Sequence, residues 1–77
     1  MPTVLRSGPY RFYFYSSDGG EPPRVHVARD ELEAKFWLDP VRLAHSAGFR
    51  PSDIRRIASI IEENQQQLLG AWDEFFS

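Results

Sequence analysis

The sequence predicts an α+β fold, in which a four-stranded, mainly antiparallel sheet is followed by a short helix and a long C-terminal helix packed on one face. The first half alternates apolar and polar residues and is rich in aromatic side chains, which is typical of strands. The second half spaces its apolar residues by three or four, which is typical of helices. With only 77 residues, we expect a single domain over 1–77, with the sheet in 1–38 and two helices in 39–77.

Turn residues separate the four expected strands. Residues 3–6 form a short apolar run that ends at a Ser-Gly-Pro turn, and residues 10–15 read YRFYFY, an alternating aromatic strand. Residues 25–29 and 32–38 form two further strands around Asp30 and Glu31. Residues 16–23, SSDGGEPP, are the one clear loop, and we expect this loop to be the most flexible segment.

Two proline-containing start signals predict the helices. Asp39 fits an N-cap, Pro40 a first helical position and Gly48 a C-terminal cap, so a short helix is expected over 40–47. Pro51 opens the long helix, expected over 51–76. Its apolar face comprises Ile54, Ile57, Ala58, Ile61, Leu68, Trp72 and Phe75. This face is interrupted at Asn64 and Gln65, which indicates either a solvated stretch or a polar device that sets register at a helix–helix interface.

The third and fourth strands predict a hairpin with two chemically distinct faces. A two-residue turn at Asp30 and Glu31 pairs His26 with Lys35, and a four-residue connection of the same parity remains an alternative. Because side chains alternate across a strand, one face carries Val25, Val27, Ala34 and Phe36, and the other carries Arg24, His26, Glu33, Lys35 and Trp37.

Seven side chains are therefore expected on the sheet face opposite the helices. If Phe12 and Phe14 point into the core, the residues on the far side are Arg11, Tyr13, Tyr15, Arg24, His26, Lys35 and Trp37, which we call the basic–aromatic face and take as candidate binding residues. Such a face serves cross-strand stabilisation, a protein interface or contact with nucleic acid. A homodimer or a small cognate protein is the expected partner, and RNA is the alternative.

Composition excludes several classes of function. The chain carries nine basic and eleven acidic residues, a net charge of −2, unlike a strongly basic nucleic-acid-binding domain. No cysteine is present, and His26 and His45 lie far apart in the sequence, so we expect neither a metal nor a cofactor. No apolar run is long enough to span a membrane and the N-terminus does not open a signal peptide, which predicts a cytoplasmic protein without membrane partners.

Catalysis is the less favoured expectation. If the protein is an enzyme, the candidate residues are His26, Lys35 and Glu33, because Lys35 favours a neutral His26 imidazole and Glu33 lies diagonally across the same face. The sequence has no nucleophile elbow and no phosphate-binding loop. His45 is expected to be a surface or helix-packing residue. We therefore expect binding rather than chemistry.

Several segments, in order, resemble a family of small prokaryotic proteins. These are MPTVLR (1–6), YRFYFYS (10–16), PPRVHV (22–27), EAKFWLDP (33–40) and ENQQQLLGAW (63–72). The family is catalogued as a domain of unknown function, with the hallmarks P-P-H-V-H-V and E-A-K-F-W. The resemblance implies a neighbouring partner gene in a proposed toxin–antitoxin pair.

One position departs from the family pattern. Arg24 stands where the family has the first histidine of its hallmark, whereas His26 keeps the second. A two-histidine metal or acid–base pair on this strand is therefore lost, which favours binding. We expect a small cytoplasmic protein-interaction module, one member of a toxin–antitoxin-like pair. The alternative is an RNA-binding or RNA-cleaving toxin that uses the basic–aromatic face.

Overall fold

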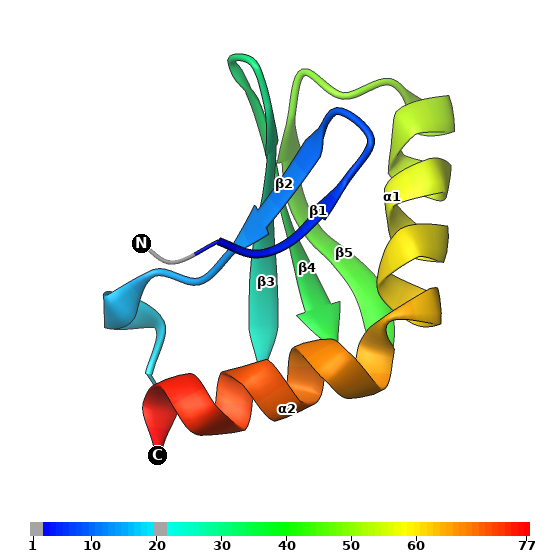
Figure 1. Ribbon diagram of the computed structural model, residues 1–77. Helices are drawn as coiled ribbons and strands as arrows, with labels where there is room; N and C mark the ends of the chain where they lie inside the picture. The colour runs from blue at the N-terminus through cyan, green and yellow to red at the C-terminus, as the bar shows by residue number, and fades with distance from the viewer. Residues whose placement is uncertain (1–2, 20–21) are drawn as a thin grey trace.

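The computed structural model describes residues 3–19 and 22–77 and has an α+β architecture with an antiparallel sheet, as predicted (Figure 1). Within these residues five strands pair in chain order, each antiparallel to the next. They are β1 (Thr3–Ser7), β2 (Tyr10–Tyr13), β3 (Arg24–Arg29), β4 (Leu32–Leu38) and β5 (Val41–Ala47). A short 3₁₀ helix, η1 (Ser16–Asp18), follows β2, and the chain ends with α1 (Pro51–Glu63) and α2 (Gln65–Phe76).

The predicted short helix over 40–47 is wrong, because this segment is β5, and the sheet therefore has five strands and extends beyond residue 38. Asp39 and Pro40, taken as a helix start, instead form the two-residue link between the paired Leu38 and Val41, and their peptide bond is cis. Without β5, the backbone groups of β4 that point away from β3 would lack strand partners, and pairing outweighs the weak local preference for helix. Gly48 follows β5 at φ 94°, a backbone conformation that favours glycine, and it lies against the Leu32 side chain.

The predicted long helix is broken in two at Asn64, whose backbone leaves the helical region at φ −115° and ψ 18°. Its side-chain amide donates to the Ile60 carbonyl oxygen at 2.8 Å and so helps to end α1. The next side chain, Gln65, donates to the Leu38 carbonyl oxygen of β4 at 2.7 Å. The polar gap is therefore the corner between two helices, neither a solvated stretch nor a device at a helix–helix interface. Figure 1 shows α2 turning away from α1 and running across the strands.

The core lies between one face of the sheet and the two helices. Its buried side chains form one cluster: Tyr10, Phe12, Phe14, Val25, Val27, Ala34, Phe36, Leu38, Ile57, Ile61, Leu68 and Trp72. The predicted hairpin register is confirmed, since His26 pairs with Lys35 and Val25 with Phe36 around the two-residue turn. The predicted loop over 16–23 begins with η1, and its flexibility is untested because Gly20 and Glu21 lie outside the described residues.

The corner at Gln65 yields a stability prediction. Gln65→Ala removes the 2.7 Å hydrogen bond to the partly buried junction with β4, so the free energy of unfolding should fall by about 1 kcal/mol in urea titrations. The neighbouring Gln66 is exposed, so Gln66→Ala is the matched control and should leave the stability unchanged. Equal effects of the two changes would contradict a specific role for Gln65.

Candidate functional site

A row of four polar side chains crosses the sheet on the face turned away from the helices, which we call the open sheet face. Tyr13 of β2 pairs with His26 of β3, His26 with Lys35 of β4, and Lys35 with His45 of β5. Directly paired residues of neighbouring strands point to the same side of a sheet. The row therefore places an imidazole on each side of the Lys35 strand. We call these four residues the cross-sheet row.

Asp18 holds His26 in place from η1. One carboxylate oxygen, Oδ2, lies 2.7 Å from Nε2 of His26, and it also accepts the backbone N–H of Tyr15 at 3.3 Å. The other oxygen, Oδ1, pairs with Nη1 of Arg24 at 3.3 Å. Asp18 is only 9% exposed, so these bonds to a charged acceptor are partly shielded from water. The carboxylate therefore orients the imidazole and leaves Nδ1 as the ring nitrogen that Asp18 does not engage.

Two tyrosine rings pack against His26. Tyr13 stacks on the imidazole with ring centroids 5.5 Å apart, and Tyr15 meets it edge to face at 4.4 Å. The guanidinium carbon of Arg11 lies 4.5 Å from the centre of the Tyr13 ring. Tyr13 is consequently only 2% exposed, so the expectation that it is displayed on the surface is wrong. Its role is to pack against His26.

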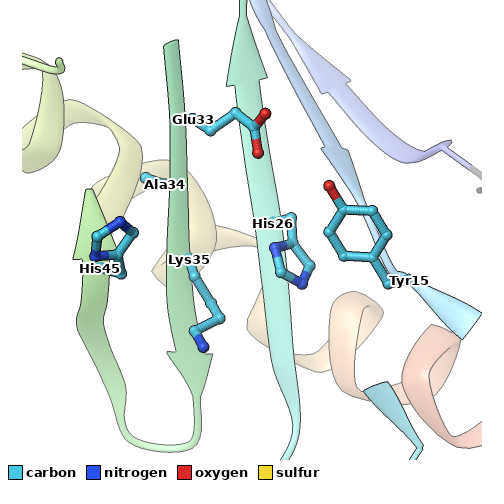
Figure 2. A pocket seen from close by; sticks show the side chains of 6 residues that line it. All are labelled: Tyr15, His26, Glu33, Ala34, Lys35 and His45. Carbon is cyan, nitrogen blue, oxygen red and sulfur yellow. The ribbon is translucent and has the colours of Figure 1, made fainter. Parts of the chain in front are cut away.

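A shallow pocket of about 200 Å³ opens beside this histidine. It is lined by Tyr15, His26, Glu33, Ala34, Lys35 and His45. Figure 2 shows the side chains of His45, Lys35, His26 and Tyr15 side by side, with the helices behind the strands. Sites for whole small molecules commonly measure about 300–1,000 Å³, so this pocket fits part of a larger ligand better than a complete small one.

Charge is segregated onto the open sheet face. Strand pairing and parity place five of the nine basic side chains there: Arg6, Arg11, Arg24, Lys35 and Arg42. Of the acidic residues that the structure describes, Asp18 and Glu33 contribute carboxylates to this face, and the others lie in the turns between strands or on α1 and α2. This face is therefore positive although the whole chain carries a net charge of −2.

The structure brings all seven residues of the basic–aromatic face onto the open sheet face. Trp37 lies near two cations, with Nζ of Lys35 5.6 Å and the guanidinium carbon of Arg24 5.7 Å from its ring centre. The expected partnership of Glu33 with His26 is not found: Glu33 accepts a hydrogen bond from the Tyr13 hydroxyl at 3.5 Å, and Asp18 takes its place.

Sequence reasoning missed four contributors to this face. Asp18 lies in the segment predicted to be a loop. The one sequence signal for it is that Arg24 and His26 share a strand face, which indicates a carboxylate partner nearby. His45 and Arg42 were hidden by the helix prediction over 40–47, although His45 now lines the pocket. Arg6 joins the face because it pairs with Arg11.

Within residues 3–19 and 22–77, no group of three or more His, Asp or Glu side chains is placed to hold a metal ion. None of the helices described is long and apolar enough to cross a membrane.

The chain matches the model of one protein family, described as "Domain of unknown function (DUF4160)", over residues 10–73. The match includes the whole cross-sheet row and Asp18. No curated protein and no solved structure matches the chain.

Two tyrosines give the fold a predicted sensitivity to alkali. Burial raises the pKa of Tyr13 well above its ordinary value of 10.0, aided by Tyr15 and the Glu33 charge, and burial together with Asp53 raises the pKa of Tyr10. The folded state thus favours the neutral phenols. The free energy of unfolding should therefore keep its full value below about pH 10 and fall as the pH rises further, because the unfolded chain releases these protons first.

Urea unfolding between about pH 9 and about pH 11 measures this effect. Tyr13→Phe removes the phenol and should make the alkaline loss of stability less steep. A free energy of unfolding that stays constant over this range would contradict the prediction.

Proposed function

Because the chain belongs to the DUF4160 family of domains of unknown function, its function is inferred from its own surface, and we propose that the open sheet face binds single-stranded RNA. The observation that carries the proposal is the segregation of charge: five basic side chains share this face with two carboxylates. Lysine and arginine neutralise phosphates and release counterions, which supplies most of the sequence-independent affinity for nucleic acid.

The arrangement of these cations supports a chain-like ligand. They lie on every strand from β1 to β5, so they extend across the sheet rather than surround one point. Tyr15 and Trp37 are partly exposed among them and offer ring surface for unpaired bases. The pocket at the cross-sheet row has the size for one segment of such a chain. A phosphate backbone with unstacked bases therefore complements this face.

Opposite charge changes at two pocket residues test RNA binding. Lys35→Gln should weaken binding of a single-stranded RNA oligonucleotide and reduce the slope of log affinity against log salt by about 0.7, because one phosphate contact is lost. Glu33→Gln removes a repulsive carboxylate and should strengthen binding, while its amide oxygen can still accept from Tyr13. Fluorescence anisotropy at several salt concentrations measures both.

The matched control is Arg56→Gln. Arg56 is an exposed cation of α1, away from the open sheet face, so this change alters the net charge as Lys35→Gln does but should leave binding unchanged. Absence of binding at low salt, or equal weakening by the two changes, would overturn the proposal.

A cytoplasmic protein–protein module, one member of a toxin–antitoxin-like pair, is the second candidate, and a groove between β5 and α1 favours it. Leu43, Phe49 and Ile54 line this groove, and Leu43 is 45% exposed. The buried Ser46 hydroxyl beside them has no hydrogen-bond partner in the described part of the chain. A homodimer or a small cognate protein that contributes an apolar side chain and a polar backbone group would satisfy both features.

The groove yields its own prediction. Leu43→Gln should weaken dimerisation or binding of the protein encoded by the neighbouring gene, and light scattering with and without that protein measures both. The change should not affect RNA binding, because Leu43 pairs with Phe36 on the helix side of the sheet. If the protein is strictly monomeric and does not bind the protein encoded by the neighbouring gene, the second candidate is excluded.

A further inference from the structure

We propose that the cross-sheet row cleaves the RNA that the open sheet face binds, with His26 as general base, His45 as general acid and Lys35 as the stabilising cation between them. This inference rests on the proposed function. It concerns the chemistry at one pocket, whereas RNA binding concerns the whole face.

The first argument is the position of His26. Its Nε2 is held by Asp18 at 2.7 Å, and no hydrogen bond to its Nδ1 occurs within the described residues. The Asp18 carboxylate favours the tautomer with hydrogen on Nε2, because an imidazole N–H donates to a carboxylate. Nδ1 is then an acceptor available to the pocket that His26 lines. A base whose second nitrogen is fixed by a carboxylate follows the logic of catalytic triads.

The second argument is the spacing of the two imidazoles. His26 and His45 each lie opposite Lys35, on the two strands that flank β4. Strands are about 4.8 Å apart, so the two backbones stand roughly 10 Å from one another, with both side chains pointing to the open sheet face. A phosphodiester in the pocket above Lys35 would therefore have one imidazole on its nucleophile side and one on its leaving-group side (Figure 2).

The reaction balances without a further reactant. Nδ1 of His26 takes the proton of a ribose 2′-hydroxyl, and the 2′ oxygen attacks the adjacent phosphorus to form a new P–O bond. The P–O5′ bond breaks, and the protonated His45 gives its proton to the departing 5′ oxygen. The products are a 2′,3′-cyclic phosphate and a 5′-hydroxyl end. Proton exchange with water then restores both rings, and no electrons are transferred to or from the substrate.

Lys35 and Asp18 support this reaction in different ways. The ammonium group of Lys35 lies between the histidine strands and opposes the negative charge that develops on the phosphoryl oxygens. Asp18 is a positioning residue, since it acts through His26 and not on the substrate. Glu33 lines the same pocket, but its carboxylate accepts a bond from the Tyr13 hydroxyl and is directed to β2.

The experiment compares a labelled single-stranded RNA with its all-2′-deoxy analogue. We expect cleavage of the RNA to 2′,3′-cyclic phosphate and 5′-hydroxyl ends, and binding without cleavage of the deoxy analogue, which lacks the nucleophile. His45→Gln should lower kcat by about 10²- to 10⁴-fold, the usual contribution of a general acid, with KM little changed. His45 is exposed on an edge strand, so this variant should fold normally.

Asp18→Asn tests the positioning role. The amide can donate to Nε2 and leave the proton on Nδ1, so kcat should fall while KM is retained; a merely structural role would change KM as well. Arg56→Gln, prepared identically, is the control that should keep full activity, and the loss of cleavage in His45→Gln prepared the same way excludes a contaminating nuclease.

The outcomes separate the two proposals. A protein that binds the RNA but does not cut it overturns this inference and leaves the proposed function standing. A protein that binds neither RNA nor the deoxy analogue overturns both. Products with a 3′-hydroxyl and a 5′-phosphate, or cleavage that survives both His45→Gln and His26→Gln, overturn the assignment of the two histidines.

Discussion

The pairing of His26 with Lys35 is the constraint on which the rest of the structure depends. Because side chains alternate along a strand, this one pair determines that Val25, Val27 and Phe36 enter the core. A slip of one residue would place Lys35 among the phenylalanines of the core and expose those apolar side chains to water. The register of β3 and β4 therefore places both the core residues and the cross-sheet row, and a change in register would alter both.

The hairpin was predictable from the sequence because its signal is local, whereas β5 and the corner at Asn64 depend on tertiary partners. The alternation around Asp30 and Glu31 implies the register whatever the rest of the chain does. Residues 41–47 have no comparable alternation, and they form a strand because β4 offers an unpaired edge. Gln65, the first residue of α2, likewise ties the corner to β4 by donating to the Leu38 carbonyl oxygen, 27 residues earlier, and no helical period reveals this bond.

The candidate site shows the same division. Strand parity places six of the seven residues of the basic–aromatic face on one side of the sheet, although Tyr13 is buried there, and Tyr15 reaches the same side from the segment that follows β2. The identity of Asp18 does not follow from strand parity, because its place depends on tertiary contacts of η1: Tyr15 packs on His26, and the Tyr15 N–H donates to Asp18. The position of His45 follows only once residues 41–47 are known to form β5. Strand parity therefore predicts the basic surface. The two further groups of the proposed acid–base site lie elsewhere: Asp18 in the segment predicted as a loop, and His45 on the edge strand β5.

Arg24 shares the Asp18 carboxylate with His26. A histidine at this position would place a second imidazole beside Asp18; the arginine instead contributes a permanent cation that pairs with Oδ1, while Oδ2 remains on His26. Three donors, the Arg24 guanidinium, the His26 imidazole and the Tyr15 backbone N–H, fix the orientation of this carboxylate more firmly than any one bond alone, because rotation would break all three. With arginine at this position, the site has one titratable ring fewer than it would have with histidine, and the Asp18 carboxylate is held in one orientation. Asp18 therefore orients one imidazole on β3, that of His26, while the pairing of β5 with β4 independently places the imidazole of His45 on the far side of Lys35.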